Sequence, residues 1–177
     1  IETRVFDLPH GDLFFDRPLL AATTLTNGNS VAITAGQYWL LDANKTPKWA
    51  ARIMPSSGVT WQYSTAAEYV QVISMLGVWG YHKDYGSAWE DTTATLSAAI
   101  ASNSTTSFTC TTGKLVAGDL IKIDAEYFYV SSVATNTVDT ITCVRGANGS
   151  TAVTHTISTA VYRWLPEPDI VTLARAG

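Results

Sequence analysis

Three residues in the second half of the chain carry the side chains that acid–base or metal chemistry needs. Glu126 supplies a carboxylate, Arg145 a fixed positive charge and His155 an imidazole, and Asp119 and Asp124 are near Glu126 in the sequence. A carboxylate and a histidine can exchange protons with a substrate or bind a metal ion. The alternative is a structural polar network that binds turn backbone groups and holds the loop 146–156. We favour the structural network, because a β pattern alone does not locate a reactive site.

No recognised catalytic or binding motif accompanies these residues. The chain has no nucleophile elbow, no HExxH and no Gly-rich phosphate loop. Asp12 and Asp16 flank an apolar segment and could bind a hard cation as a pair, but a solvated edge is the preferred interpretation. We therefore expect no catalytic residue, no cofactor and no metal, and the protein is predicted not to be an enzyme. An enzyme fragment that uses Glu126 and His155 is the third-ranked hypothesis.

The two cysteines, Cys110 and Cys143, fall on inward parities of two expected strands. A disulfide requires those strands to be neighbours. Two buried free thiols are the favoured interpretation, since a cytosolic β module needs no bridge. Neither cysteine has the spacing of a metal site.

The chain is rich in aromatic residues, with six Trp and eight Tyr. Trp79 and Trp61 are expected in the core. Tyr81, Tyr85 and Trp89 lie in a polar stretch that contains glycine, and they are the candidates for an interface. Aromatic clusters suit protein interfaces and also sugar-binding surfaces.

The positions of these residues depend on a β pattern that organises residues 105–164. Strand-like runs alternate there with turn signals, which is typical of a small antiparallel module. The strongest turn signal is Gly146 to Gly149, where Asn148-Gly149 tolerates positive φ. The first half of the chain shows the same pattern, with a hairpin signal at Asn27-Gly28, while residues 90–104 indicate a linker or an irregular segment. A helix is expected to begin with Asp169 as its N-cap.

These patterns predict an all-β protein of two small antiparallel modules, sandwich-like or barrel-like, with a short C-terminal helix start. The expected domains are residues 1–91 plus 165–177, and an inserted module at residues 92–164.

The composition restricts the function further. Hydrophobic residues make up 46% of the 177-residue chain and charged residues 15%, so the chain can bury a core. The net charge is −4 with no basic run, which argues against sequence-specific duplex binding and against an anionic membrane surface. No apolar stretch has transmembrane length. Because the chain begins with Ile1 rather than Met, we expect either processing or a longer parent protein.

The order of the segments resembles the head–tail connector (adaptor) proteins of long-tailed bacteriophages. The entry TRVFDLP, the segment LFFDRPLLAATTLTNGNSVAITAGQYWLL, then WAARIMPSS and VISMLGVWGYH follow that pattern. In such proteins the last element leads into a Pro-acidic helix start, which here is PEPDIVTLARA after residues 92–164. The intervening module is similar to a small β unit of phage tail and connector proteins, through GDLIKIDAEYFYV and VRGANGSTAVTH.

The resemblance implies a structural virion protein that is assembled in the host cytoplasm. Its partners would be identical subunits in a ring, together with portal and tail proteins, with DNA passing through a channel without sequence-specific binding and without any membrane. The alternative is a tail-associated or secreted β binding module that recognises carbohydrate through exposed Trp and Tyr.

Overall fold

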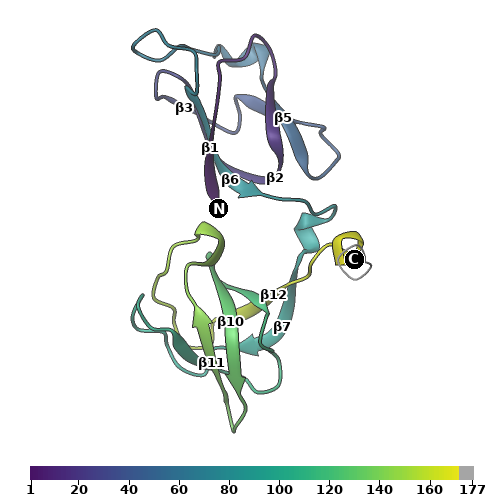
Figure 1. Cartoon of the computed structure of the whole chain (residues 1–177), viewed down its shortest axis with the longest axis vertical. Coiled ribbons are helices and arrows are strands. Elements are labelled where there is room, and N and C mark those ends of the chain that lie inside the picture. The colour runs from purple at the N-terminus through teal and green to yellow at the C-terminus, as the bar shows by residue number, and fades with distance from the viewer. Residues whose placement is uncertain (172–177) are drawn as a thin grey trace. The chain divides into compact units, whose positions relative to one another are not determined.

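The computed structural model describes residues 1–171 and has the expected all-β architecture, with two antiparallel sheets and a short C-terminal helix. The chain divides into two compact units, Ile1–Tyr85 and Gly86–Gly177 (Figure 1). Each sheet belongs to one unit. The assignment of residues 165–177 to the first module stays a prediction.

The first unit is a six-stranded sheet. Its strand order is β1-β6-β2-β5-β4, with β3 paired to β2. The bounds are β1 (Glu2–Phe6), β2 (Leu13–Thr26), β3 (Ala32–Ile33), β4 (Tyr38–Leu41), β5 (Lys48–Ile53) and β6 (Ile73–Trp79). One face of the sheet packs a core that includes Leu13, Leu19, Leu25, Ile73 and Met75. Strands β1 and β4 end the order, so each has one unpaired edge within the sheet.

Strand β2 joins two segments that the sequence separates at Asp16-Arg17-Pro18. Its first part pairs with β5 and its second part with β6, and the register shifts between Phe14 and Leu19. Pro18 lies within that irregularity, where its missing N–H costs no ladder hydrogen bond. Strand β2 therefore continues through Pro18, although a proline in a regularly paired part of the strand would remove a hydrogen bond between strands.

The Asn27-Gly28 hairpin is confirmed, with β3 returning against the end of β2. The Asn27 side chain accepts hydrogen bonds from Gly28 N (3.0 Å) and Gln62 N (2.9 Å) and donates to Thr60 O (2.9 Å). Glycine is required at position 28, because a Cβ atom there would lie 2.1 Å from Gln62 O.

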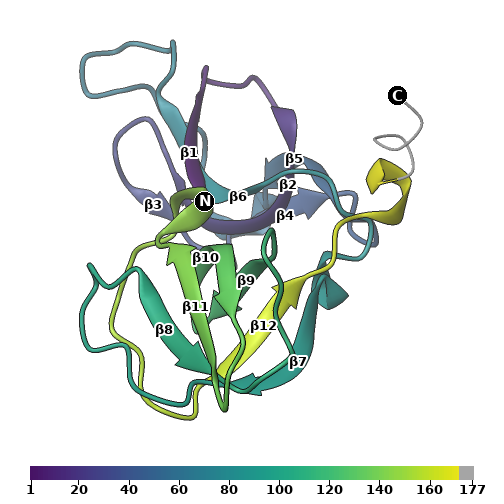
Figure 2. The ribbon, with the colours of Figure 1, turned by 60° about the horizontal axis from the view of Figure 1, so that its bottom comes forward.

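The second unit is a six-stranded sheet in the order β7-β12-β9-β10-β11-β8 (Figure 2). The bounds are β7 (Trp89–Thr95), β8 (Ser107–Cys110), β9 (Leu120–Ile123), β10 (Glu126–Ala134), β11 (Asp139–Val144) and β12 (Ala160–Trp164). The two end strands also meet, through the Leu96–Cys110 bridge and the hydrogen bond from Thr111 N to Thr95 O. The sheet thereby closes around a core that includes Phe128, Ile121, Ile141 and Val161.

Strand β7 corrects the expectation of a linker or irregular segment at residues 90–104. Trp89–Thr95 pairs with β12 over five positions. Thr92, Thr93 and Thr95 are β-branched and favour a strand, although the burial of this segment does not alternate cleanly. The Thr/Ser-rich composition hides the strand because few of its side chains are apolar.

Short helical turns complete the fold. Among residues 1–171 there are three 3-10 turns, η1 (Pro55–Ser57), η2 (Tyr85–Ser87) and η3 (Ala147–Gly149). A C-terminal helix begins at position 168, one residue before the predicted N-cap Asp169. The rest of the predicted helix lies outside the described residues.

Candidate functional site

The second unit brings Glu126, Arg145 and His155 together from three separate segments. Glu126 is the first residue of β10, and Arg145 directly follows β11. His155 lies before β12 and forms a bridge with Ile100, with hydrogen bonds in both directions between the two backbones. The antiparallel pairing of β10 and β11 places the start of one strand beside the end of the other, which brings Glu126 close to Arg145.

The Glu126 carboxylate is fully buried and accepts five hydrogen bonds. Oε1 accepts from Arg145 Nε (2.6 Å) and Gly146 N (3.1 Å). Oε2 accepts from Arg145 Nη2 (2.7 Å) and Val153 N (2.9 Å), and lies 3.0 Å from His155 Nε2. Both oxygens are therefore occupied by donors from the protein itself.

The Arg145 guanidinium uses all five of its N–H groups. Besides the two bonds to Glu126, Nη1 donates to Ser102 O (3.0 Å) and Thr105 O (3.1 Å), and Nη2 donates to Val153 O. The guanidinium also lies over the Phe128 ring, 4.9 Å from its centroid. A guanidinium forms five donors in a fixed fork, so no donor remains for a ligand.

His155 lies between two carboxylates. Its Nδ1 is 2.7 Å from Asp124 Oδ2, and its Nε2 is 3.0 Å from Glu126 Oε2. Ionised carboxylates only accept hydrogen bonds, so a ring nitrogen of His155 that carries a hydrogen donates it to the carboxylate beside it. The imidazole is fully buried, while the Asp124 side chain is largely exposed.

Two opposing effects set the pKa of Glu126. Burial alone would raise this pKa above its usual value of 4.5. The hydrogen bonds from Arg145, the Val153 amide, His155 and the Gly146 amide outweigh burial and lower the pKa to about 2. The carboxylate is therefore ionised throughout the neutral range.

This arrangement acts as a clamp, a name used below for Glu126, Arg145, His155 and Asp124. The clamp fixes the segment 102–105, the loop 146–153 and the start of β10 to one another. Asp124 joins it, as its nearness to Glu126 in sequence suggested, whereas Asp119 instead accepts from Val116 N (2.9 Å) in its own turn. Proton or metal exchange would require the buried donors to leave first, so the geometry favours the structural interpretation over the catalytic one.

The predicted turn residues follow the clamp directly. Asn148 has φ 51° and Gly149 has φ 76°, and both belong to η3. Gly146 also has positive φ, 61°, and a Cβ atom there would lie 3.0 Å from Ser150 O. The positive φ that the sequence pattern indicates is present at three positions of this turn.

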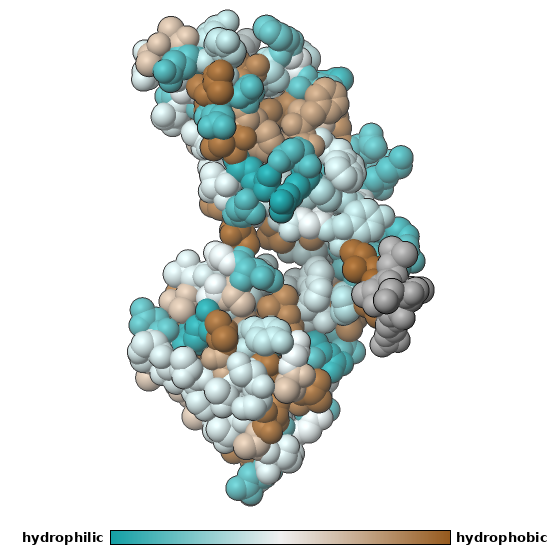
Figure 3. Space-filling model, in the orientation of Figure 1, coloured by the Kyte–Doolittle hydropathy of each residue, from teal (hydrophilic) through white to brown (hydrophobic). Residues whose placement is uncertain are grey.

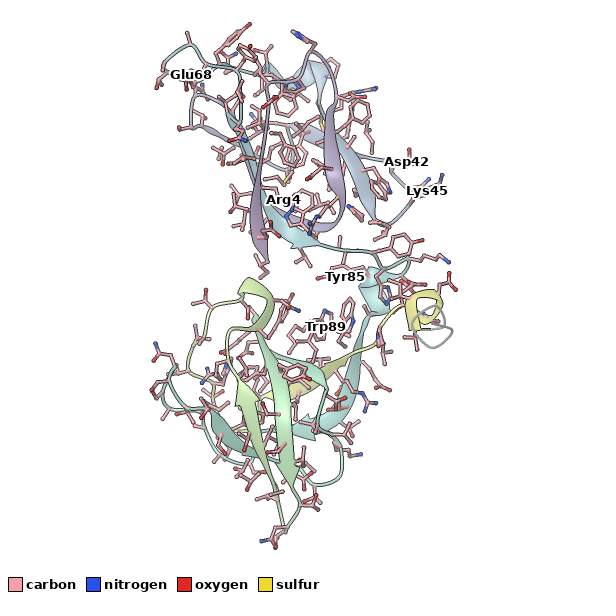
Figure 4. All side chains as sticks on the ribbon, viewed as in Figure 1. Arg4, Asp42, Lys45, Glu68, Tyr85 and Trp89 are labelled. Carbon is pink, nitrogen blue, oxygen red and sulfur yellow. The ribbon has the colours of Figure 1, made fainter. Side chains whose placement is uncertain are left out.

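The three aromatic interface candidates have different environments. Tyr81 is 41% exposed, whereas Tyr85 and Trp89 are half-buried; Tyr85 and Trp89 carry labels in Figure 4. The Trp89 ring packs against Tyr127 (centroids 5.1 Å apart) and Trp164 (5.2 Å), and Lys122 Nζ lies 5.0 Å from it. Trp89 therefore contributes to packing within the second unit.

Large apolar side chains are also exposed on the sheet of the first unit, at positions that were not predicted as interface candidates. Phe14 is 73% exposed and Trp39 47%. Phe14 and Leu41 both pair with Ala50, and Trp39 pairs with Arg52, so all of these lie on the face opposite the core. We call Phe14, Trp39, Leu41, Ala50 and Arg52 the outer face. Because Leu13, Phe14 and Phe15 are all apolar, the sequence carries no local signal for the face that Phe14 occupies.

A wide pocket borders this region at the edge strand β4. Its volume is about 720 Å³, and its walls include Tyr38, Trp39, Leu40, Lys48 and Met54. Figure 3 shows hydrophobic residues at the surface of the first unit. Asp42 and Lys45, labelled in Figure 4, lie in the loop that follows β4.

Asp12 forms a two-pronged pair with Arg52 (2.6 and 2.7 Å), and Asp16 pairs with Arg4, so the two aspartates are engaged separately. Within residues 1–171 there is no group of three or more His, Cys, Asp or Glu that could hold a metal ion. Cys110 and Cys143 are buried free thiols, as predicted.

Comparison of the chain with protein families, with curated proteins and with solved structures finds no match. In the part of the chain that the structure describes, no helix is both long and apolar enough to cross a membrane.

Proposed function

We propose that this protein is a non-enzymatic structural subunit of a phage virion, a head–tail connector that assembles with identical copies into a ring between portal and tail. The proposal rests on the sequence resemblance and on one structural observation, the exposure of Phe14 and Trp39 on the outer face of the first unit. Large apolar side chains that gather on one face mark interaction sites in soluble proteins. Ring assembly would bury this surface.

The clamp in the second unit supports the same proposal. Its carboxylate and guanidinium are saturated by protein donors and acceptors, which suits a rigid module that is loaded mechanically rather than one that turns over a substrate. A subunit with net charge −4 also suits a channel through which DNA slides, because tight phosphate binding needs Lys and Arg.

Negative-stain electron microscopy of the purified chain tests the proposal. We expect closed rings with a central hole. Images that contain only particles the size of one chain would count against a ring-forming subunit.

The exposed tryptophans favour a second candidate function, recognition of carbohydrate on the first unit. Trp39 borders the 720 Å³ pocket, and Trp49 is 49% exposed. Sugars stack on exposed aromatic rings, and Trp39→Ala would remove such a ring without disturbing a buried residue. Glycan-array binding that disappears in Trp39→Ala would favour carbohydrate recognition. An array without signal would exclude this function.

A further inference from the structure

The chain contains two Asn-Gly pairs, and the structure gives them opposite environments. Asn27-Gly28 closes the β2–β3 hairpin, and Asn148-Gly149 lies in η3. Asn27 is 4% exposed, whereas Asn148 and Gly149 are both exposed. Asn-Gly is the sequence in which the next backbone nitrogen reaches the asparagine side chain most easily, because glycine has no Cβ to obstruct it.

The geometry points to Asn148 as a site of spontaneous modification. We propose that Gly149 N attacks Asn148 Cγ. A new C–N bond forms, the bond to the amide nitrogen breaks, and ammonia leaves with the proton of the attacking amide. Water then opens the cyclic imide at either carbonyl, which yields aspartate or isoaspartate. Water is the only co-reactant, and no oxidant or reductant is needed.

Asn27 is protected from the same reaction by its hydrogen bonds. Its Oδ1 accepts from Gly28 N and Gln62 N, and its Nδ2 donates to Thr60 O. Gly28 N is thereby held to the side-chain oxygen, and the backbone of Gln62 and Tyr63 encloses Gly28 closely. The reaction at Asn27 must wait for the hairpin to open.

The turn that carries Asn148 differs from the hairpin in its exposure to solvent, since Asn148 and Gly149 are both exposed. None of the three residues of η3 is buried, so rotation of the backbone at Asn148 unpacks no core side chain, while Gly146 N and Val153 N stay bonded to Glu126 on either side of the turn. Local opening free energies are lowest in such exposed loops and highest in core strands. The product is a new carboxylate, or a lengthened backbone, in the loop that Glu126 holds through Gly146 N and Val153 N.

The test is peptide mapping of the full chain after incubation in mildly alkaline buffer. Cleavage after Arg145 and Arg163 releases residues 146–163, in which amide and acid forms are separated by mass spectrometry. Enzymatic methylation of isoaspartate gives a second readout. We expect modification at Asn148 to exceed that at Asn27 by roughly tenfold or more, since about 1.4 kcal/mol of difference in opening free energy already gives tenfold.

Two controls make the outcome decisive. Asn148→Gln should remove the signal from residues 146–163, and incubation in concentrated urea should bring the two sites to similar rates. Equal rates in the folded chain would overturn the proposal. An unmodified Asn148 over a period in which the urea-unfolded chain reacts would overturn it as well.

Discussion

Arg145 and Glu126 form a buried bidentate ion pair, with Nε 2.6 Å from Oε1 and Nη2 2.7 Å from Oε2. The side chains are 6% and 0% exposed. This pair connects the end of β11 to the start of β10, and backbone groups of the segments at 102–105 and 146–153 complete its hydrogen bonds.

Removal of one partner of this pair is predicted to be costly. Arg145→Met leaves the Glu126 charge buried without its cation, and the unfolding free energy should fall by about 3–5 kcal/mol. Arg163→Met is the matched control, because Arg163 forms a half-exposed pair with Glu90 in the same unit. Its effect should stay within about 1 kcal/mol. Urea denaturation compares the two, and equal effects would show that the clamp does not stabilise the unit.

The pH dependence of stability should report the Glu126 carboxyl. Its folded pKa, about 2, lies below the unfolded value of 4.5, so its stabilisation is complete above 4.5 and is lost as pH falls through about 2. The full effect is about 3 kcal/mol. Hydrogen exchange of peptides from residues 120–130 and 141–156, measured between those pH values, should show progressive loss of protection. Glu126→Gln should lack this acid-dependent component, and an unchanged profile in that variant would contradict the assignment.

Both cysteines should be unreactive in the native state. Burial raises the pKa of the Cys110 and Cys143 thiols to about 11, and the charge of Asp139 adds to the effect at Cys110. The thiolate is the nucleophile, so labelling by iodoacetamide at pH 8 should require unfolding. Mass spectrometry should find two labels per chain in denaturant and none over the same period without it. Rapid native labelling of either cysteine would show that its strand opens.

Much of this fold is predictable from the sequence because its turns carry local signals. Asn27-Gly28 marks a hairpin, and Asn148-Gly149 marks the turn with positive φ. The clamp residues were identified by type, but their mutual geometry depends on the pairing of β10 with β11, which is a long-range property. The exposure of Phe14 could not be derived with certainty, since an apolar residue between two buried ones has no local sign of the face it occupies. Strand β7 was missed because threonine suits both strands and loops.

Glycine at position 28 should be irreplaceable. Gly28→Ala places a methyl group 2.1 Å from Gln62 O, so the backbone must shift, and we expect a loss of about 2 kcal/mol or more. Gly11→Ala is the control, because nothing lies within 4 Å of its Cβ position. Thermal unfolding of the two variants measures the difference. If the Gly28→Ala protein unfolds at the same temperature as the wild type, the hairpin does not approach residues 62–63 this closely.

The mass of the purified protein in solution tests the central claim, assembly into a ring, most directly. One chain has a mass of 19.1 kDa. Size-exclusion chromatography with light scattering should give a single species at a whole-number multiple of that mass, threefold or higher, as a closed ring of identical subunits requires. A mass of one chain across the accessible concentration range would contradict the proposed connector.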